Sequence, residues 1–149
     1  MAWLVVGLAV AGLVIAGSFT AAFYRPGSAL ARLAPPEWCG VRAGDAQLDP
    51  AKPGCETVIQ TPGARVFGLP NSLLGLIYYV AIIGVALTGF PPALRTWSIG
   101  AAWLTVALGI YLGYRLLRVE RMSCPLCWTA HAINTLLATV LTVAYRNPP

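Results

Sequence analysis

The sequence predicts an all-α integral membrane protein, a four-helix bundle with a long cysteine-containing loop between helices 1 and 2. Of its 149 residues, 58% are hydrophobic and 10% charged, whereas a soluble domain carries about 25% charged residues. Four apolar stretches are each long enough for the roughly 20 residues that a membrane-spanning helix needs. They cover residues 2–23, 72–90, 97–117 and 126–145. For this length, we expect one domain covering residues 1–149.

These stretches carry further features of membrane spans. Arg115 is the only Lys, Arg, Asp or Glu within them, and it lies near a helix end, where a long side chain can reach the interface. Tyr24, Trp97, Tyr114 and Tyr145 also lie near helix ends, as in an aromatic belt. The first stretch lacks a basic start and exceeds the 7–15 residues or so of a signal-peptide core. We therefore interpret it as a span.

The connection formed by residues 24–71 is the only long one. Its many prolines and glycines indicate turns rather than sheet or long helix, with a short helix expected around Ser28 to Leu33. Connections longer than about 15 residues without structure of their own are usually functional or disordered. By parity, this loop and the turn at residues 118–123 lie on the same side of the membrane. That face would hold all four cysteines, namely Cys39, Cys55, Cys124 and Cys127.

The motif Cys124-Pro-Leu-Cys127 opens the fourth span. On a helix, positions i and i+3 lie roughly 5–6 Å apart, within reach of a disulfide after small adjustment. Ser123 is the expected N-cap, and Pro125 falls in the first turn, where its missing N–H is tolerated. The free N–H groups there favour thiolate over thiol. Two cysteine pairs on one face therefore predict a relay that moves a disulfide from Cys39/Cys55 to Cys124/Cys127 or back.

Other interpretations of the cysteines remain open. They include a zinc site, inert buried thiols, and a structural four-span protein whose loop is held by a Cys39–Cys55 disulfide. Structural zinc sites use closely paired motifs, and fifteen residues separate Cys39 from Cys55, so we expect no metal. The net charge of +5 could suggest nucleic acid. However, the basic residues are interleaved with acidic ones and form no recognised motif, so we expect no nucleic-acid partner.

Polar residues continue along one face of the fourth span. Cys124, Cys127, His131 and Asn134 are spaced i, i+3, i+7 and i+10 and share that face. His and Asn within a span should point to the bundle interior or to a ligand. For Asn134, interhelical hydrogen bonding is the alternative. A lipophilic quinone could reach a thiol here from the bilayer, and His131 and Asn71 are the candidate hydrogen-bond donors to its carbonyls.

The chain resembles the vitamin K epoxide reductase family, including its bacterial and archaeal homologues. The resemblance covers most of the chain and rests on the order of the cysteines and on two segments. These are Gly-Leu-Pro-Asn-Ser-Leu-Leu-Gly at residues 68–75 and Cys124-Pro-Leu-Cys127 followed by Ala132-Ile133-Asn134. The resemblance implies a four-helix bundle around a quinone that is menaquinone-like, ubiquinone-like or vitamin K.

The resemblance also implies roles for the cysteines. Cys127 would act on the quinone, Cys124 would exchange with Cys55, and Cys39 would meet an external dithiol. That partner would be a soluble or membrane-anchored thioredoxin-like protein. We expect it to be a separate chain, because no thioredoxin-like domain follows Tyr145.

Two further residues take roles from the resemblance. Asn71 matches a residue that hydrogen-bonds the quinone, and Thr61 matches a Ser or Thr that positions the loop. His131 stands where the vertebrate enzymes carry Tyr, and it can also donate a hydrogen bond to a carbonyl. The related bacterial disulfide-forming quinone reductase has its Cys-x-x-Cys motif in the first loop, whereas here the motif opens the last span.

The distribution of charge predicts how the protein sits in the cell membrane. Eight Lys and Arg residues flank the spans on the cysteine side and two on the other: Arg25, Arg32, Arg42, Lys52, Arg65, Arg115, Arg118 and Arg121 against Arg95 and Arg146. The positive-inside rule then places the active-site face in the cytoplasm. Disulfide-forming proteins usually face an oxidising compartment, so the extracytoplasmic orientation is the alternative.

Overall fold

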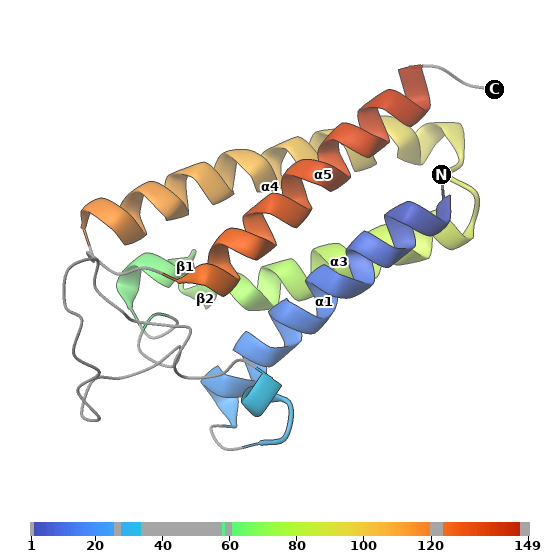
Figure 1. Cartoon of the computed structure of the whole chain (residues 1–149). Coiled ribbons are helices and arrows are strands. Elements are labelled where there is room, and N and C mark those ends of the chain that lie inside the picture. Colours follow the sequence, from blue (N-terminus) through green and yellow to red (C-terminus); the bar gives the residue numbers. More distant parts are fainter. Residues whose placement is uncertain (1, 26–27, 34–57, 59–60, 120–123, 147–149) are drawn as a thin grey trace.

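Four long helices form the bundle that the sequence predicts (Figure 1). The computed structural model describes residues 2–25, 28–33, 58, 61–119 and 124–146. The helices are α1 (Ala2–Tyr24), α3 (Asn71–Leu87), α4 (Pro92–Arg118) and α5 (Pro125–Arg146). The predicted all-α membrane fold is thus confirmed.

The four helices differ in length. Among the described residues, α1, α4 and α5 are long and apolar enough to cross a membrane, while α3 is a shorter apolar helix of 17 residues. At 1.5 Å per residue α3 extends for about 26 Å, slightly less than the hydrocarbon core of about 30 Å. Helix α3 alone is therefore slightly short for a membrane span.

Helix α3 ends three residues before the end of the apolar stretch at residue 90, for a local reason. The N–H of Phe90 donates to the carbonyl of Val85, and that of Gly89 donates to Ala86. This is the Schellman arrangement, which requires a left-handed residue after the helix. Gly89 supplies it with φ 74°. Helix α4 then begins at Pro92, where proline suits the first helical position.

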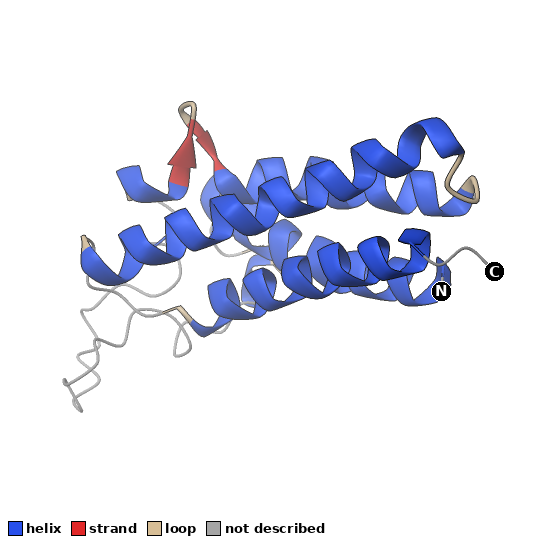
Figure 2. Ribbon diagram, turned by 90° about the horizontal axis from the view of Figure 1, so that it is seen from above, coloured by secondary structure: helices blue, strands red, loops and turns tan. Residues whose placement is uncertain are grey.

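The helices pack closely through small side chains. Helix α1 contacts α3 and α5, and α4 contacts α5. Seen from above, the long helices run along roughly the same direction (Figure 2). Ala9, Ala102 and Ala138 have 0% exposed surface. In a membrane, such residues let helix backbones approach closely, and packing rather than the hydrophobic effect then holds the helices together.

The described parts of the long connection contain only short elements. The 3₁₀ helix η1 (Ala31–Leu33) confirms the expected short helix, and the Ser28 hydroxyl accepts a hydrogen bond from the Ala31 N–H at 3.2 Å. The expectation of turns without sheet is wrong for the end of this connection. There, β1 (Arg65–Val66) pairs antiparallel with β2 (Leu69–Pro70).

The loop of this hairpin explains why it forms. Phe67 and Gly68 have φ of 51° and 82°, the two positive values of the type I′ turn that joins tightly paired strands. The hairpin leads directly into Asn71, the first residue of α3. It therefore fixes where that helix begins.

The two ends of the bundle differ in what they carry. The hairpin, the end of α4 and the start of α5 lie at one end, whereas the start of α1, the α3–α4 turn and the end of α5 lie at the other (Figure 1). Cys124 precedes α5 and thus belongs to the hairpin end. Cys39 and Cys55 lie outside the described residues.

Candidate functional site

A cavity opens between the helices near the hairpin end of the bundle. Its volume is about 130 Å³, close to that of an engineered cavity of about 150 Å³ that accepts benzene. Most of its lining is apolar, with a few polar groups among it: Thr61, Asn71, Ser72, Tyr79, Cys127, His131 and Asn134. An apolar cavity with a few placed polar groups is typical of a small-molecule site.

The cavity brings together several site residues predicted from the sequence. Thr61, Asn71, Cys127, His131 and Asn134 all line it, although they come from α3, α5 and the segment before the hairpin. The predicted loop cysteines lie outside the described residues. A zinc site formed by all four cysteines would need Cys39 and Cys55, so the described residues do not test that alternative.

Cys124 and Cys127 are joined by a disulfide, with their Cα atoms 5.2 Å apart. The backbone N–H of Cys127 donates to Cys124 Sγ at 3.2 Å, and α5 begins at Pro125. Cys124 therefore occupies the N-cap position expected for Ser123, which lies outside the described residues. An N–H group directed at sulfur at a helix N-terminus favours its thiolate form once the disulfide is reduced.

The two cysteines differ in whether they line the cavity. Cys127 lines the cavity, while Cys124 has 0% exposed surface and belongs to a cluster with Phe19, Ala22 and Val58. Val58 follows Cys55 by three residues in the chain. Cys127 also packs against this cluster. Both cysteines thus lie near the segment that follows the loop cysteines, and Cys127 is the one that also lines the cavity.

Thr61 stabilises the turn that leads to the hairpin. Its hydroxyl donates to the carbonyl of Val58 at 2.8 Å, and it precedes the 3₁₀ helix η3 (Pro62–Ala64). Val58 is 4% exposed and also lines the cavity. The hydrogen bond therefore holds one end of the long connection against the cavity wall.

Asn71 is positioned by its place at the start of α3. The next residue, Ser72, has its hydroxyl 3.1 Å from that of Thr20 on α1, within hydrogen-bonding distance. Both Asn71 and Ser72 line the cavity. The start of α3 is thus fixed on one side by the hairpin and on the other by α1.

His131 packs against a glycine of α4. A Cβ atom at Gly109 would lie 2.6 Å from His131 Nδ1, so only glycine leaves room for this ring position. Trp128 makes an edge contact with the His131 ring, with the ring centroids 6.1 Å apart. Within the described part of the chain, Nδ1 is buried without a hydrogen-bond partner. The ring therefore lies between α4 and the cavity that it lines.

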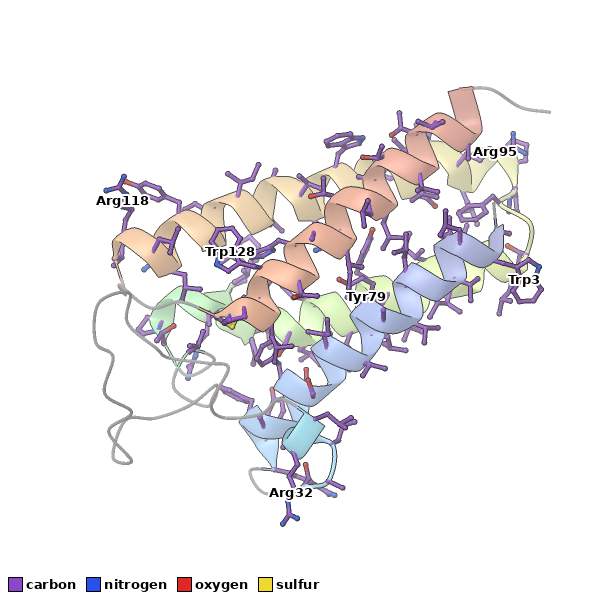
Figure 3. The ribbon with its side chains drawn as sticks, viewed as in Figure 1. Trp3, Arg32, Tyr79, Arg95, Arg118 and Trp128 are labelled. Atoms are coloured by element: carbon purple, nitrogen blue, oxygen red, sulfur yellow. A yellow bond between two sulfur atoms is a disulfide. The ribbon has the colours of Figure 1, made fainter. Side chains whose placement is uncertain are left out.

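Sequence reasoning missed Tyr79, which is labelled in Figure 3. Its side chain is 3% exposed and lines the cavity, and its hydroxyl donates to Asn134 Oδ1 at 2.7 Å. The interhelical hydrogen bond that was the alternative role for Asn134 is therefore present, and Asn134 lines the cavity as well. One signal could have found Tyr79: Asn71, Gly75 and Tyr79 are spaced i, i+4 and i+8, so they share a helix face.

Comparison with known proteins identifies a family. No curated protein and no solved structure matches the chain. The profile of the Vitamin K epoxide reductase family matches residues 3–142, a range that contains all four cysteines and every polar residue of the cavity. Members of this family are oxidoreductases. The chain therefore belongs to the vitamin K epoxide reductase family.

Proposed function

We propose that the protein is a quinone-dependent thiol oxidoreductase that produces disulfides in a thioredoxin-like partner. One observation carries the proposal: Cys127, from a Cys-x-x-Cys pair, lines a cavity between membrane helices that has room for an aromatic ring. Membership in a family of oxidoreductases supports it. The quinone would enter from the bilayer.

The proposed reaction balances without another cofactor. The thiols of Cys124 and Cys127 supply two electrons and two protons, the quinone takes them up to become a hydroquinone, and the cysteines form a disulfide. Cys127 is the thiol that meets the quinone, because it lines the cavity. Asn71, His131 and Asn134 are the proposed donors to the quinone carbonyls.

The new disulfide then returns to dithiol by exchange. Cys124 is packed with Val58, so the segment that carries Cys55 is the proposed source of the attacking thiol. A mixed disulfide between Cys55 and Cys124 would resolve through Cys39, leaving a Cys39–Cys55 disulfide. A dithiol of the soluble or membrane-anchored partner would reduce that bond and become oxidised itself. Thr61 would hold the end of the loop during these steps.

Purified protein in detergent should catalyse reduction of decylubiquinone by dithiothreitol, with one quinone reduced per dithiol oxidised. Replacing Asn71 with alanine should raise the KM for the quinone about tenfold, because one hydrogen bond to the carbonyl is lost. Ser98→Ala is the control, since this serine is buried in α4 and bonds only the Leu94 carbonyl among the described contacts. A rate no higher than the uncatalysed reaction would rule the proposed function out.

We further propose that the protein lies in the cell membrane with its cysteine end in the cytoplasm. The basis is the excess of Lys and Arg at that end. A membrane-impermeant maleimide added to intact cells after reduction should then leave the cysteines unlabelled, while permeabilised cells should become labelled. Labelling in intact cells would instead establish the extracytoplasmic orientation.

A further inference from the structure

Tyr79 and Asn134 form a polar contact between α3 and α5 at the cavity wall. The Tyr79 hydroxyl donates to Asn134 Oδ1 at 2.7 Å, and both side chains line the cavity. Tyr79 is 3% exposed. Its hydroxyl proton therefore has little access to water and needs an acceptor within the protein.

This contact determines which end of the Asn134 amide serves a ligand. An amide side chain has an oxygen that accepts and an NH₂ group that donates, and rotation by 180° exchanges them. If the NH₂ group faced Tyr79, the buried Tyr79 proton would lose the acceptor that it has in the structure. Donation by Tyr79 therefore holds Oδ1 toward α3 and leaves the NH₂ group for a ligand.

Gly12 of α1 makes this position of Tyr79 possible. A Cβ atom at residue 12 would overlap the end of the Tyr79 ring, meeting Cζ, Cε1 and the hydroxyl oxygen. Gly12 also lines the cavity and is buried. The position of the amide thus depends on three helices, because α1 accommodates the tyrosine of α3 that orients the asparagine of α5.

We propose that Tyr79 is a positioning residue that orients the Asn134 amide so that its NH₂ group donates to a quinone carbonyl. The inference rests on the proposed function and adds the residue that sets the donor direction at one wall of the site. A fixed donor favours an acceptor on the ligand, because a ligand that covers the NH₂ group without a carbonyl at that point would leave it unpaired.

The test is a double-mutant cycle with decylubiquinone as the probe and dithiothreitol at saturating concentration. Tyr79→Phe keeps the ring and removes only the hydroxyl, and it should raise the KM for the quinone about tenfold with kcat changed less than about twofold. A purely structural defect would lower the fraction of active protein, and so kcat, without changing KM. In the Asn134→Leu background, Tyr79→Phe should change the KM less than about twofold, because Tyr79 acts through Asn134.

Tyr78→Phe is the matched control, since Tyr78 lies on the same helix but belongs to the core around the cavity rather than to its polar lining. Its KM should equal that of the wild type. If Tyr79→Phe leaves KM unchanged, or if its effect is as large without Asn134 as with it, the inference is overturned while the proposed function stands. If the wild type fails to reduce the quinone, both are overturned.

Discussion

Replacing Cys127 with serine should lower dithiol-driven quinone reduction on the order of 10³-fold or more, as removal of a reacting nucleophile does in enzymes. The physical reason is that Cys127 is the cysteine of the described pair that lines the cavity, so it is the thiol that we propose meets the quinone. Serine has nearly the same shape and should preserve the fold. The measurement is the initial rate of decylubiquinone reduction at saturating dithiothreitol, after subtraction of the uncatalysed rate.

Cys124→Ser separates the roles of the two cysteines. It should also stop turnover, but it leaves a Cys127 thiol at the cavity that no longer has a partner with which to form a disulfide. An apolar maleimide should label that thiol, and decylubiquinone should protect it. In Cys127→Ser, labelling of Cys124 should be slow, because Cys124 is fully buried, and the quinone should not affect it. Quinone protection of Cys124 instead of Cys127 would contradict the assigned order.

Gly12→Ala should destabilise the protein by about 1–3 kcal/mol, the usual effect of an extra methyl group in a packed interior. The new methyl group would occupy the space of the Tyr79 ring. The ring must then move, which breaks its hydrogen bond to Asn134. We therefore also expect a higher KM for the quinone. Thermal unfolding in detergent and steady-state kinetics measure the two effects.

Gly7→Ala is the control for this variant because it lies on the same helix with nothing within 4 Å of the added Cβ. Alanine favours helix over glycine by about 1 kcal/mol, so Gly7→Ala should unfold at the wild-type temperature or slightly higher. Equal unfolding temperatures and equal KM values for Gly12→Ala and the wild type would show that Tyr79 can move without consequence.

The helices could be predicted from the sequence because lipid imposes a simple requirement. A spanning segment must be apolar and must satisfy its own backbone hydrogen bonds, so α1, α4 and α5 are visible as apolar runs. The same periodic geometry placed Cys127, His131 and Asn134 on one face of α5, and all three line the cavity.

Features that depend on local backbone geometry could not be predicted as well. Hydropathy does not mark the end of α3, which is set by the left-handed Gly89 and its hydrogen bonds. The hairpin at residues 65–70 was missed because Phe67-Gly68 is not among the usual Asn-Gly or Asp-Gly signals of a type I′ turn.

The contacts between helices could not be predicted from the sequence either. Gly12 and Gly109 lie within apolar stretches of the sequence, but which side chain each accommodates depends on how the helices dock. The Tyr79 side chain packs against Gly12, and the His131 side chain packs against Gly109. A tyrosine inside an apolar span is typical of core, so its hydrogen bond to Asn134 became apparent only in the folded arrangement.

A single-turnover experiment tests the central claim most directly. In a protein with Cys39→Ser and Cys55→Ser, the Cys124–Cys127 pair is reduced, the reductant is removed, and excess decylubiquinone is added without oxygen. We expect one hydroquinone per protein molecule, with both thiols lost to a re-formed disulfide. Absence of hydroquinone, or its formation while Cys124 and Cys127 still titrate as thiols, would contradict the coupling of this cysteine pair to a quinone.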